Sequence, residues 1–164
     1  MDGTLLRTMP AFLVDRNAGR LVKWLRAFGF DAEFADDGAD GQLVARALRE
    51  GRTLVTKDRR MLDRRVIANG ELPVVVITAD RLDQQLREFF SVVPLQADLH
   101  FSRCMRCNVL LRAVAKQDVR ALVPPYVYAH HDAFSRCPQC GRVYWQGTHW
   151  EHMENVLQEA MADA

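Results

Sequence analysis

Short apolar runs alternate with helical repeats along the first 95 residues. Residues 11–14 are too few for a helix and too apolar for an exposed loop, so they predict a buried strand. Apolar residues then recur at helical spacing up to Gly29, which predicts an amphipathic helix capped by Asn17. A second short strand is expected at residues 32–34. A strand, a helix and a strand in this order begin a parallel sheet with crossover helices.

The same alternation continues to residue 95. Asp40 is expected to cap a helix over 41–50, and a strand follows at 53–56. A helix beginning at residue 59 is expected to stop near Gly70, before a β-branched strand at 74–78 and a helix at 80–90. The fold class is therefore α/β with a mostly parallel sheet, over residues 11–95. From residue 96 cysteine pairs and prolines replace the helical pattern, which predicts a second small module over 96–164 that ends in a helix.

Composition indicates what kind of protein this is, but it says little about its function. The chain is 49% hydrophobic and 26% charged, as in ordinary globular proteins. Its formal net charge of +1 means that a nucleic-acid partner must be argued from local patches. No apolar run approaches the ~20 residues of a membrane span, and no secretory signal precedes residue 11. We therefore expect a cytoplasmic protein with no membrane partner; the sequence does not indicate the oligomeric state.

All four cysteines belong to two Cys-x-x-Cys pairs. A two-residue spacing lets both sulfurs of a pair reach one metal from a tight turn, and two such turns supply a tetrahedral site. In a reducing compartment such pairs are more often metal ligands than disulfides. Each pair precedes a residue that tolerates positive φ, Asn108 or Gly141. We expect a structural zinc ion, with rubredoxin-type iron as the alternative, on Cys104, Cys107, Cys137 and Cys140.

The cysteine module is either a staple for the fold or a staple that also contacts RNA. A closed four-thiolate site has no open position for catalysis, so zinc is structural in both interpretations. Basic groups beside aromatic rings suit single-stranded RNA, but they suit an ordinary packed surface equally well. The side chains concerned are Arg103, Arg106, Arg136, Arg142, Tyr144 and Trp145.

Aspartates stand at the ends of the predicted strands. Asp15 ends the first strand and Asp58 follows the third. If the second strand flanks the first on the side away from the third, both acids face the crevice where the strand order reverses. Asp40 can approach from the side, and Asp36 and Asp37 are near enough in sequence to compete with it. Converging carboxylates repel one another, and Mg²⁺ or Mn²⁺ would relieve this repulsion through all-oxygen ligands.

Such a metal site can hold a phosphodiester and activate a water molecule. Basic side chains near these acids in sequence can hold the neighbouring phosphates; they include Arg16, Arg20, Lys57, Arg59 and Arg60. The ordinary interpretation is that each of the three acids caps the helix that follows it and that the arginines form a solvated face. The shared position of the acids at one sheet edge favours the metal site.

Several stretches together resemble a known family. The motifs FLVDRNAGRLVKWLRAFGFDAEF, DGADGQLVARALREGRTLVTKDRRML, CMRC, CPQC and VYWQGTHW resemble the Mut-seven C-terminal RNase family, a PIN-like domain with an appended zinc ribbon. The resemblance implies a PIN-like three-layer fold and metal-dependent cleavage of RNA. It implies that Asp15, Asp40 and Asp58 are the catalytic metal ligands and that the four cysteines bind zinc. A fourth acid stays open between Asp37 and Asp63. His149, in the terminal motif, either lines the RNA path or is a packing histidine.

Two other classes of function compete with the ribonuclease. A catalytically inactive RNA- or protein-binding module on the same scaffold would bind without cutting under any divalent metal. A phosphoacceptor domain of the receiver type also has acids at its strand ends, but it expects a lysine after a later strand. This chain has Thr78 and Arg81 there, which disfavours the receiver. The sequence therefore favours the ribonuclease.

Overall fold

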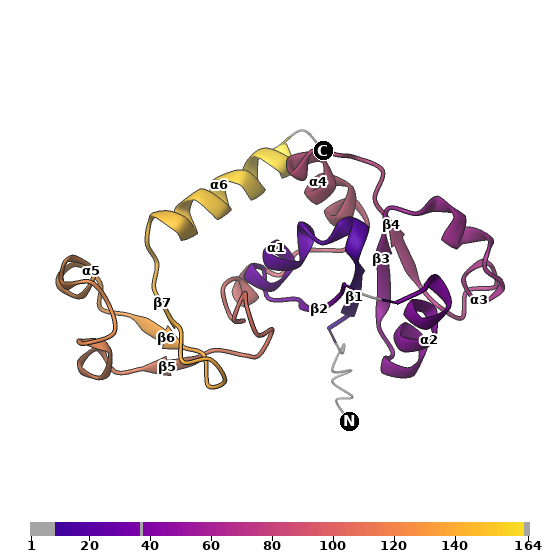
Figure 1. The fold of residues 1–164 in the computed structure, drawn as a ribbon. Coiled ribbons are helices and arrows are strands. Elements are labelled where there is room, and N and C mark those ends of the chain that lie inside the picture. Colours follow the sequence, from indigo (N-terminus) through magenta and orange to yellow (C-terminus); the bar gives the residue numbers. More distant parts are fainter. Residues whose placement is uncertain (1–8, 37, 163–164) are drawn as a thin grey trace, which may run out of the picture.

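A four-stranded parallel sheet lies at the centre of the computed structural model, which describes residues 9–36 and 38–162. The strand order is β2-β1-β3-β4, so β2 lies beside β1 on the side away from β3, as expected (Figure 1). The strand order therefore reverses between β1 and β3. The strands are β1 (Ala11–Asp15), β2 (Asp31–Ala35), β3 (Thr53–Thr56) and β4 (Val74–Val76).

Helices cover both faces of this sheet. On one face lie α1 (Leu21–Ala27) and α4 (Leu82–Val92), and on the other lie α2 (Asp40–Glu50) and α3 (Arg65–Ala68) (Figure 1). Successive side chains of β1 serve opposite faces, as pleating requires. Phe12 and Val14 pack with α1 and α4, and Leu13 packs with α2 and α3. The predicted three-layer α/β class is confirmed.

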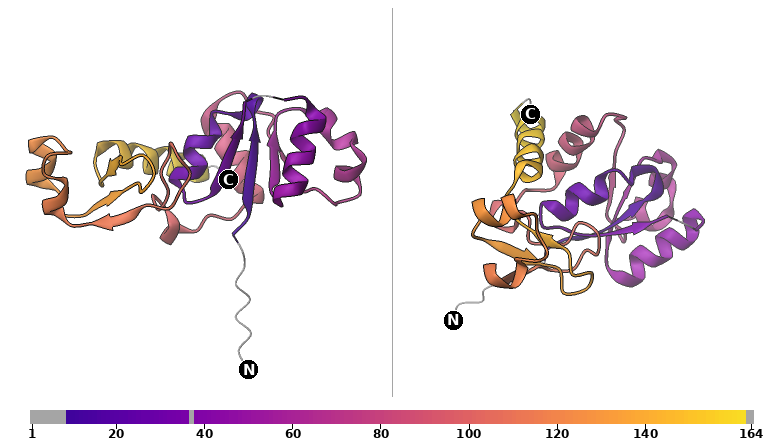
Figure 2. Two further views of the ribbon diagram at one scale, coloured as in Figure 1. Left: turned by 60° about the horizontal axis from the view of Figure 1, so that its bottom comes forward. Right: turned by 60° about the vertical axis from the view of Figure 1, so that its left-hand side comes forward.

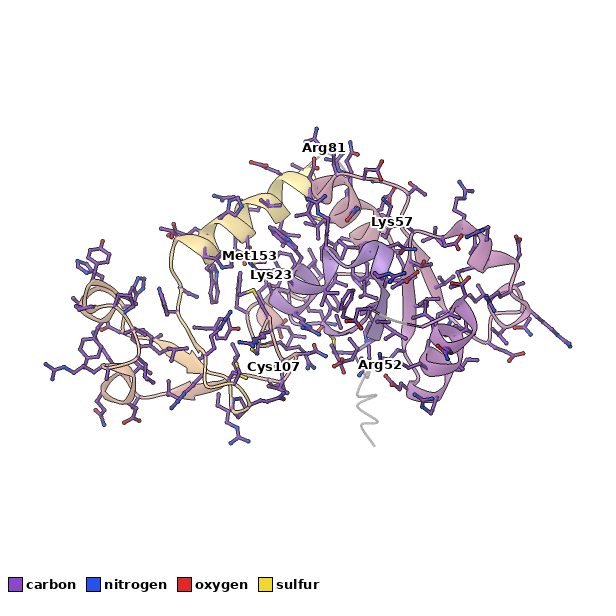
Figure 3. The ribbon with its side chains drawn as sticks, in the orientation of Figure 1. Lys23, Arg52, Lys57, Arg81, Cys107 and Met153 are labelled. Atoms are coloured by element: carbon purple, nitrogen blue, oxygen red, sulfur yellow. The ribbon has the colours of Figure 1, made fainter. Side chains whose placement is uncertain are left out.

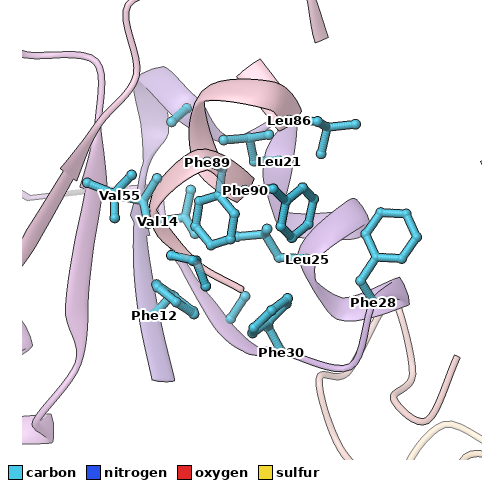
Figure 4. Close-up of a cluster of buried hydrophobic side chains, with 14 of the residues drawn as sticks. Phe12, Val14, Leu21, Leu25, Phe28, Phe30, Val55, Leu86, Phe89 and Phe90 are labelled. Atoms are coloured by element: carbon cyan, nitrogen blue, oxygen red, sulfur yellow. The ribbon is translucent and has the colours of Figure 1, made fainter. Parts of the chain in front are cut away.

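An aromatic cluster fills the layer between the sheet and helices α1 and α4 (Figure 4). Neighbouring rings meet edge to face, with centroids 5.1 Å apart for Phe12 and Phe89 and 5.8 Å apart for Phe28 and Phe90. This geometry suits the quadrupoles of the rings. The packing fixes β1, and with it the position of Asp15 at the end of that strand.

Local details differ from the predictions at three helix starts. Asn17 does not cap α1, since Arg20 precedes that helix and no side chain caps it. Asp40 is the first residue of α2 rather than its cap, because Gln42 reaches back to accept a hydrogen bond from the amide of Ala39 at 3.2 Å. The single helix expected from residue 59 is two short pieces, because Arg64 is extended (ψ 130°). These pieces are the 3-10 helix η2 (Arg59–Asp63) and α3.

The cysteine module is an antiparallel sheet with the order β5-β6-β7, which we call the zinc ribbon. Its elements are β5 (Arg112–Val114), α5 (Pro125–His130), β6 (Phe134–Arg136) and β7 (Val143–Tyr144). Helix α6 (Thr148–Ala162) then leaves the ribbon and packs along α4, where Leu157 and Ala160 enter the aromatic core (Figures 1 and 2). Within the described residues, no helix has the length and apolarity needed to cross a bilayer.

Two side chains join the first cysteine knuckle to the sheet. The guanidinium of Arg26, only 8% exposed, donates to the carbonyls of Ala32, Met105 and Arg106 at 2.8 to 3.1 Å. The buried Asn108 accepts a hydrogen bond from the amide of Ala32 at 3.0 Å, and its amide group donates to Asp31 at 2.7 Å. The ribbon is therefore fastened to the edge strand β2 by buried hydrogen bonds.

Candidate functional site

The predicted acids gather at the carboxyl edge of the sheet. A cavity of about 160 Å³ opens where the strand order reverses. Its lining includes the three predicted aspartates from three different elements, and we call it the acid cleft. Its polar lining residues are Asp15, Arg16, Asn17, Asp36, Asp40 and Asp58.

A buried hydroxyl organises one wall of the acid cleft. Thr56, fully buried at the end of β3, donates a hydrogen bond to Asp15 Oδ2 at 2.7 Å. The hydroxyl oxygen of Thr56 accepts from the amide of Asp58 at 3.1 Å and from Asn17 Nδ2 at 3.3 Å. Asn17 Oδ1 in turn accepts from the amide of Lys57 at 2.9 Å. Asp15 makes no side-chain cap bond to the helix that follows it, so its carboxylate is positioned by the neighbouring strand.

Arginines hold the other two predicted acids. Asp58 caps η2 and accepts from the Nε and Nη2 atoms of Arg60, both at 3.0 Å. These hydrogen bonds hold the pKa of Asp58 below its usual value. Asp40 lies 3.6 Å from the Nη2 atom of Arg64. Asp40 and Asp58 therefore each have a guanidinium as a partner in the acid cleft.

The acids share a cleft, but they do not form a closed ligand cage. Among the described residues, the four cysteines are the one group of three or more Cys, His, Asp or Glu whose ligand atoms all lie within 4.8 Å of one another. Asp37, a candidate fourth acid, lies outside the described residues. Asp63, the other candidate, is exposed on η2 and is not part of the cleft lining.

The predicted RNA-binding residues are dispersed. Arg16 lines the acid cleft, and Lys57 instead pairs with Asp80 at 2.5 Å. Arg20 and Arg59 are exposed and stand outside the cleft lining. His149 lies in a different cavity, where its Nε2 atom is 3.2 Å from Lys23 Nζ.

The four cysteines form a compact cluster in the zinc ribbon. All four Sγ atoms lie within 4.8 Å of one another, which suits the tetrahedral thiolate site predicted for zinc. Cys104 Sγ lies 3.1 Å from the hydroxyl of Tyr144. Burial raises the pKa of the Cys104 thiol, but hydrogen bonds from Tyr144 and from nearby backbone amides outweigh burial and lower it to about 6. Asn108 and Gly141 have positive φ after their pairs, as expected.

Comparison with known proteins decides the family. A family model described as the Mut7-C RNAse domain matches residues 10–157, nearly the whole chain. The chain belongs to the Mut7-C RNAse domain family. No curated protein and no solved structure matches the chain. The assignment to the Mut7-C RNAse domain family therefore rests on the match to the family model.

Sequence reasoning missed three residues in this Mut7-C RNAse domain. Thr56 is a buried polar residue at the end of strand β3, and a polar residue at a strand end next to the predicted acids could have indicated a role in the site. Asn17 was predicted as a cap, yet its partners lie about 40 positions away, which no local pattern reveals. Tyr144, one of the candidates for RNA contact, also has its hydroxyl 3.1 Å from Cys104 Sγ and accepts from the amide of Met105, contacts that no local pattern reveals.

Proposed function

We propose that the chain is a ribonuclease that uses Asp15, Asp40 and Asp58 to hold Mg²⁺ or Mn²⁺ and to cleave RNA phosphodiester bonds. The observation that carries the proposal is the shared cavity, which three acids from three elements line. This cavity lies at the carboxyl edge where the strand order reverses, a place where α/β sheets bind ligands. Membership of a family named for RNase activity supports the same conclusion.

The donor set of the acid cleft suits a hard divalent cation. All of its anionic donors are carboxylate oxygens, the ligands that Mg²⁺ and Mn²⁺ prefer. The arginines beside them are not buried: the side chain of Arg60 is 87% exposed and that of Arg64 is 39% exposed. Both can turn toward solvent or toward a phosphate without opening a hole in the core. The cleft therefore has room for a cation once these two ion pairs separate.

Each side chain at the cleft has a distinct part in the proposal. A divalent cation bound there would activate a water molecule and stabilise the leaving oxygen. Thr56 holds Asp15 in one orientation, and Asn17 fixes the backbone that leads to Asp58. Arg16 offers a guanidinium at the mouth of the cleft, where it can bind a phosphate oxygen.

Converting Asp15→Asn tests the assignment. Loss of an outer-shell partner costs metal sites roughly 10–100-fold, so loss of a ligand should lower RNA cleavage by more than about 100-fold. The matched control is Asp132→Asn, whose carboxylate is 95% exposed in the zinc ribbon and should be dispensable. Cleavage of labelled RNA is followed with Mg²⁺, with Mn²⁺ and with EDTA. Equal cleavage by the Asp15→Asn variant and the wild type would show that the acid site is misassigned.

A second candidate function is an RNA- or protein-binding module without catalysis. The pairing of Asp40 and Asp58 with arginines favours it, because a neutralised cleft needs no cation. This candidate predicts that the wild-type chain binds RNA and leaves it intact with either metal. The same cleavage assay separates the two functions.

A further inference from the structure

A second cavity, of about 260 Å³, lies where α1, the first cysteine knuckle and the start of α6 meet. We call it the aromatic cavity. Its wall carries four aromatic side chains and two exposed cations, and none of its lining residues is acidic. The residues that matter are Lys23, Phe101, Arg142, Tyr144, Trp145 and Trp150. This composition is unlike that of the acid cleft, and nothing in the proposed cleavage chemistry requires it.

One wall of the aromatic cavity is built on a strained residue. Phe101 has φ 56°, a left-handed conformation that is rare for a bulky side chain. Its ring lies stacked on Trp150, with centroids 3.6 Å apart and planes 23° apart. Strain of this kind persists only where the surroundings enforce it, and it concentrates at binding sites. Here the strained backbone holds a two-ring stack at the side of the cavity.

At another part of the cavity lining, the backbone of Gly147 approaches the indole of Trp145 closely. A Cβ atom at Gly147 would come within 2.8 Å of Trp145 Nε1, so only glycine fits there without a shift. The amide of Gly147 also donates to the carbonyl of Trp145 at 3.0 Å. The turn thus sets the indole of Trp145 at the cavity, on the side of the zinc ribbon.

The cations of the cavity are not neutralised by acids. In the described part of the chain, no carboxylate pairs with Lys23 or Arg142. Lys23 Nζ lies 3.2 Å from His149 Nε2, and Lys23 lies on α1 where that helix faces α6 (Figure 3). Burial, together with the charges of Lys23 and His152, lowers the pKa of His149, so its neutral ring accepts a hydrogen bond from Lys23. The cavity therefore carries positive charge beside stacked rings.

A row of exposed cations joins the two cavities. Arg16, Arg20 and Lys23 are exposed along the segment that runs from η1 (Arg16–Ala18) through the turn at Gly19 and Arg20 into α1. Arg16 lines the acid cleft and Lys23 lines the aromatic cavity. We call these three residues the basic row.

We propose that the aromatic cavity binds one unpaired nucleotide of a single-stranded RNA, with the base against the rings and the phosphates along the basic row toward the acid cleft. This inference rests on the proposed ribonuclease function and names its substrate as single-stranded. Pockets for drug-sized ligands span roughly 300–1,000 Å³, so a cavity of this size suits one base. A base within a duplex is already stacked and paired, and it cannot enter.

Binding is measured in the Asp15→Asn background, so that cleavage does not interfere. Fluorescence anisotropy of a labelled single-stranded RNA should show about tenfold weaker binding for Trp145→Ala, the size of one lost base stack. The Lys23→Ala variant should bind more weakly and should lower the slope of log affinity against log salt by about 0.7, as for one lost phosphate contact. Trp145→Phe should keep most of the affinity, and Lys116→Ala, a lysine of the ribbon outside the cavity, should match the parent. A blunt duplex of the same sequence should bind weakly and equally to all variants.

Photocrosslinking provides a readout that does not depend on the folding of any cavity variant. An RNA with one 4-thiouridine should crosslink to residues 142–150 from a single position along the strand. Crosslinks found only elsewhere, or equal affinity of Lys23→Ala, Trp145→Phe and Lys116→Ala together with equal salt slopes, would overturn the aromatic cavity as a subsite. That result leaves the Asp15→Asn cleavage test untouched. Conversely, a wild-type chain that does not cleave but crosslinks at 142–150 would overturn the nuclease and keep the subsite.

Discussion

The cysteines of the zinc ribbon and the aspartates of the acid cleft both come from distant parts of the sequence, yet the chain has assembled them to different degrees. All four sulfurs lie within 4.8 Å of one another, each knuckle with its positive-φ residue in place. The aspartates share a cavity, but their carboxylates interact with other side chains. Asp40 and Asp58 form ion pairs with arginines, and Asp15 accepts a hydrogen bond from the hydroxyl of Thr56.

The difference follows from charge. An ordinary thiol is neutral at neutral pH, and even with Cys104 ionised the four cysteines repel one another less than a cluster of ionised carboxylates does. Carboxylates are ionised at neutral pH, and their mutual repulsion keeps them apart until a cation or arginines neutralise them. A thiol cluster can therefore be set by backbone turns, whereas an acidic cluster needs its counter-ion. The following predictions separate these two cases, beginning with the largest expected effect.

Removing zinc should unfold the ribbon. Structural zinc in small domains contributes roughly 10–16 kcal/mol of apparent binding free energy, which is also folding free energy. Treatment with a thiol-reactive reagent should release one metal ion per chain, detected with a zinc indicator. The circular dichroism of the ribbon should be lost at the same time. Leaving Mg²⁺ and Mn²⁺ out of the buffer should lower the melting temperature far less than removing zinc, because a weakly bound cation adds only its binding free energy to the folded state. A ribbon that keeps its hydrogen-exchange protection without zinc would contradict the prediction.

Replacing Arg26→Met should loosen the joint between the ribbon and the sheet. The change removes buried hydrogen bonds to three carbonyls and retains the apolar stem. A hydrogen bond to a charged group contributes roughly 1.5–3 kcal/mol, so the loss of three predicts a decrease of about 4.5–9 kcal/mol in the free energy of unfolding. Urea denaturation measures it. Arg49→Met, at a side chain 71% exposed, is the control and should change little. Equal stability of the two variants would show that the joint is not tight.

Replacing Thr56→Val should disturb the acid cleft more than the fold. The substitution conserves shape but leaves the amide of Asp58 without its acceptor and Asp15 without its donor. We expect a cost of about 1–3 kcal/mol in unfolding free energy and a cleavage rate lower by roughly 10–100-fold. Thr53→Val, at the start of the same strand, is the matched control. Wild-type cleavage by Thr56→Val would remove the hydroxyl from the proposed site.

Replacing Arg60→Ala should produce the smallest effect and the most direct test of the comparison. The change frees the carboxylate of Asp58 from its exposed guanidinium. Mn²⁺ should then bind about twofold to fivefold more tightly, as expected for loss of an exposed competing charge. Electron paramagnetic resonance of Mn²⁺ measures the affinity, with the exposed Arg65→Ala as control. Weaker binding of Mn²⁺ would indicate that Arg60 does not compete with the metal.

Features set by short stretches of chain could be predicted. The apolar runs predicted the strands, and the supposed order, with the second strand beside the first on the side away from the third, is the order in the structure. The positive φ of Asn108 and Gly141 depends on neighbouring residues, and this prediction is confirmed. Asp58 forms the local cap that the ordinary interpretation offered for it, and it also lines the acid cleft. The shared cavity of Asp15, Asp40 and Asp58 follows from the same strand order.

Features set by distant partners could not be predicted. The local sequence predicted that Asn17 caps the following helix. In the structure its side chain instead donates to the hydroxyl of Thr56 and accepts from the amide of Lys57, both at the end of β3. The pairing of Arg64 with Asp40 depends on how α2 and α3 pack on one face of the sheet. The second module was expected to end in a helix, but nothing in that stretch of sequence indicated that this helix would pack on α4.

The return of α6 to the sheet domain has a consequence for synthesis on the ribosome. Leu157 and Ala160 contribute to the same core as Phe12, although the chain between them spans almost every described element. Translation adds roughly 5–20 residues per second and normally lets an N-terminal domain fold first. Because α6 supplies part of this core, the sheet domain cannot reach its final packing until residue 160 has emerged from the exit tunnel.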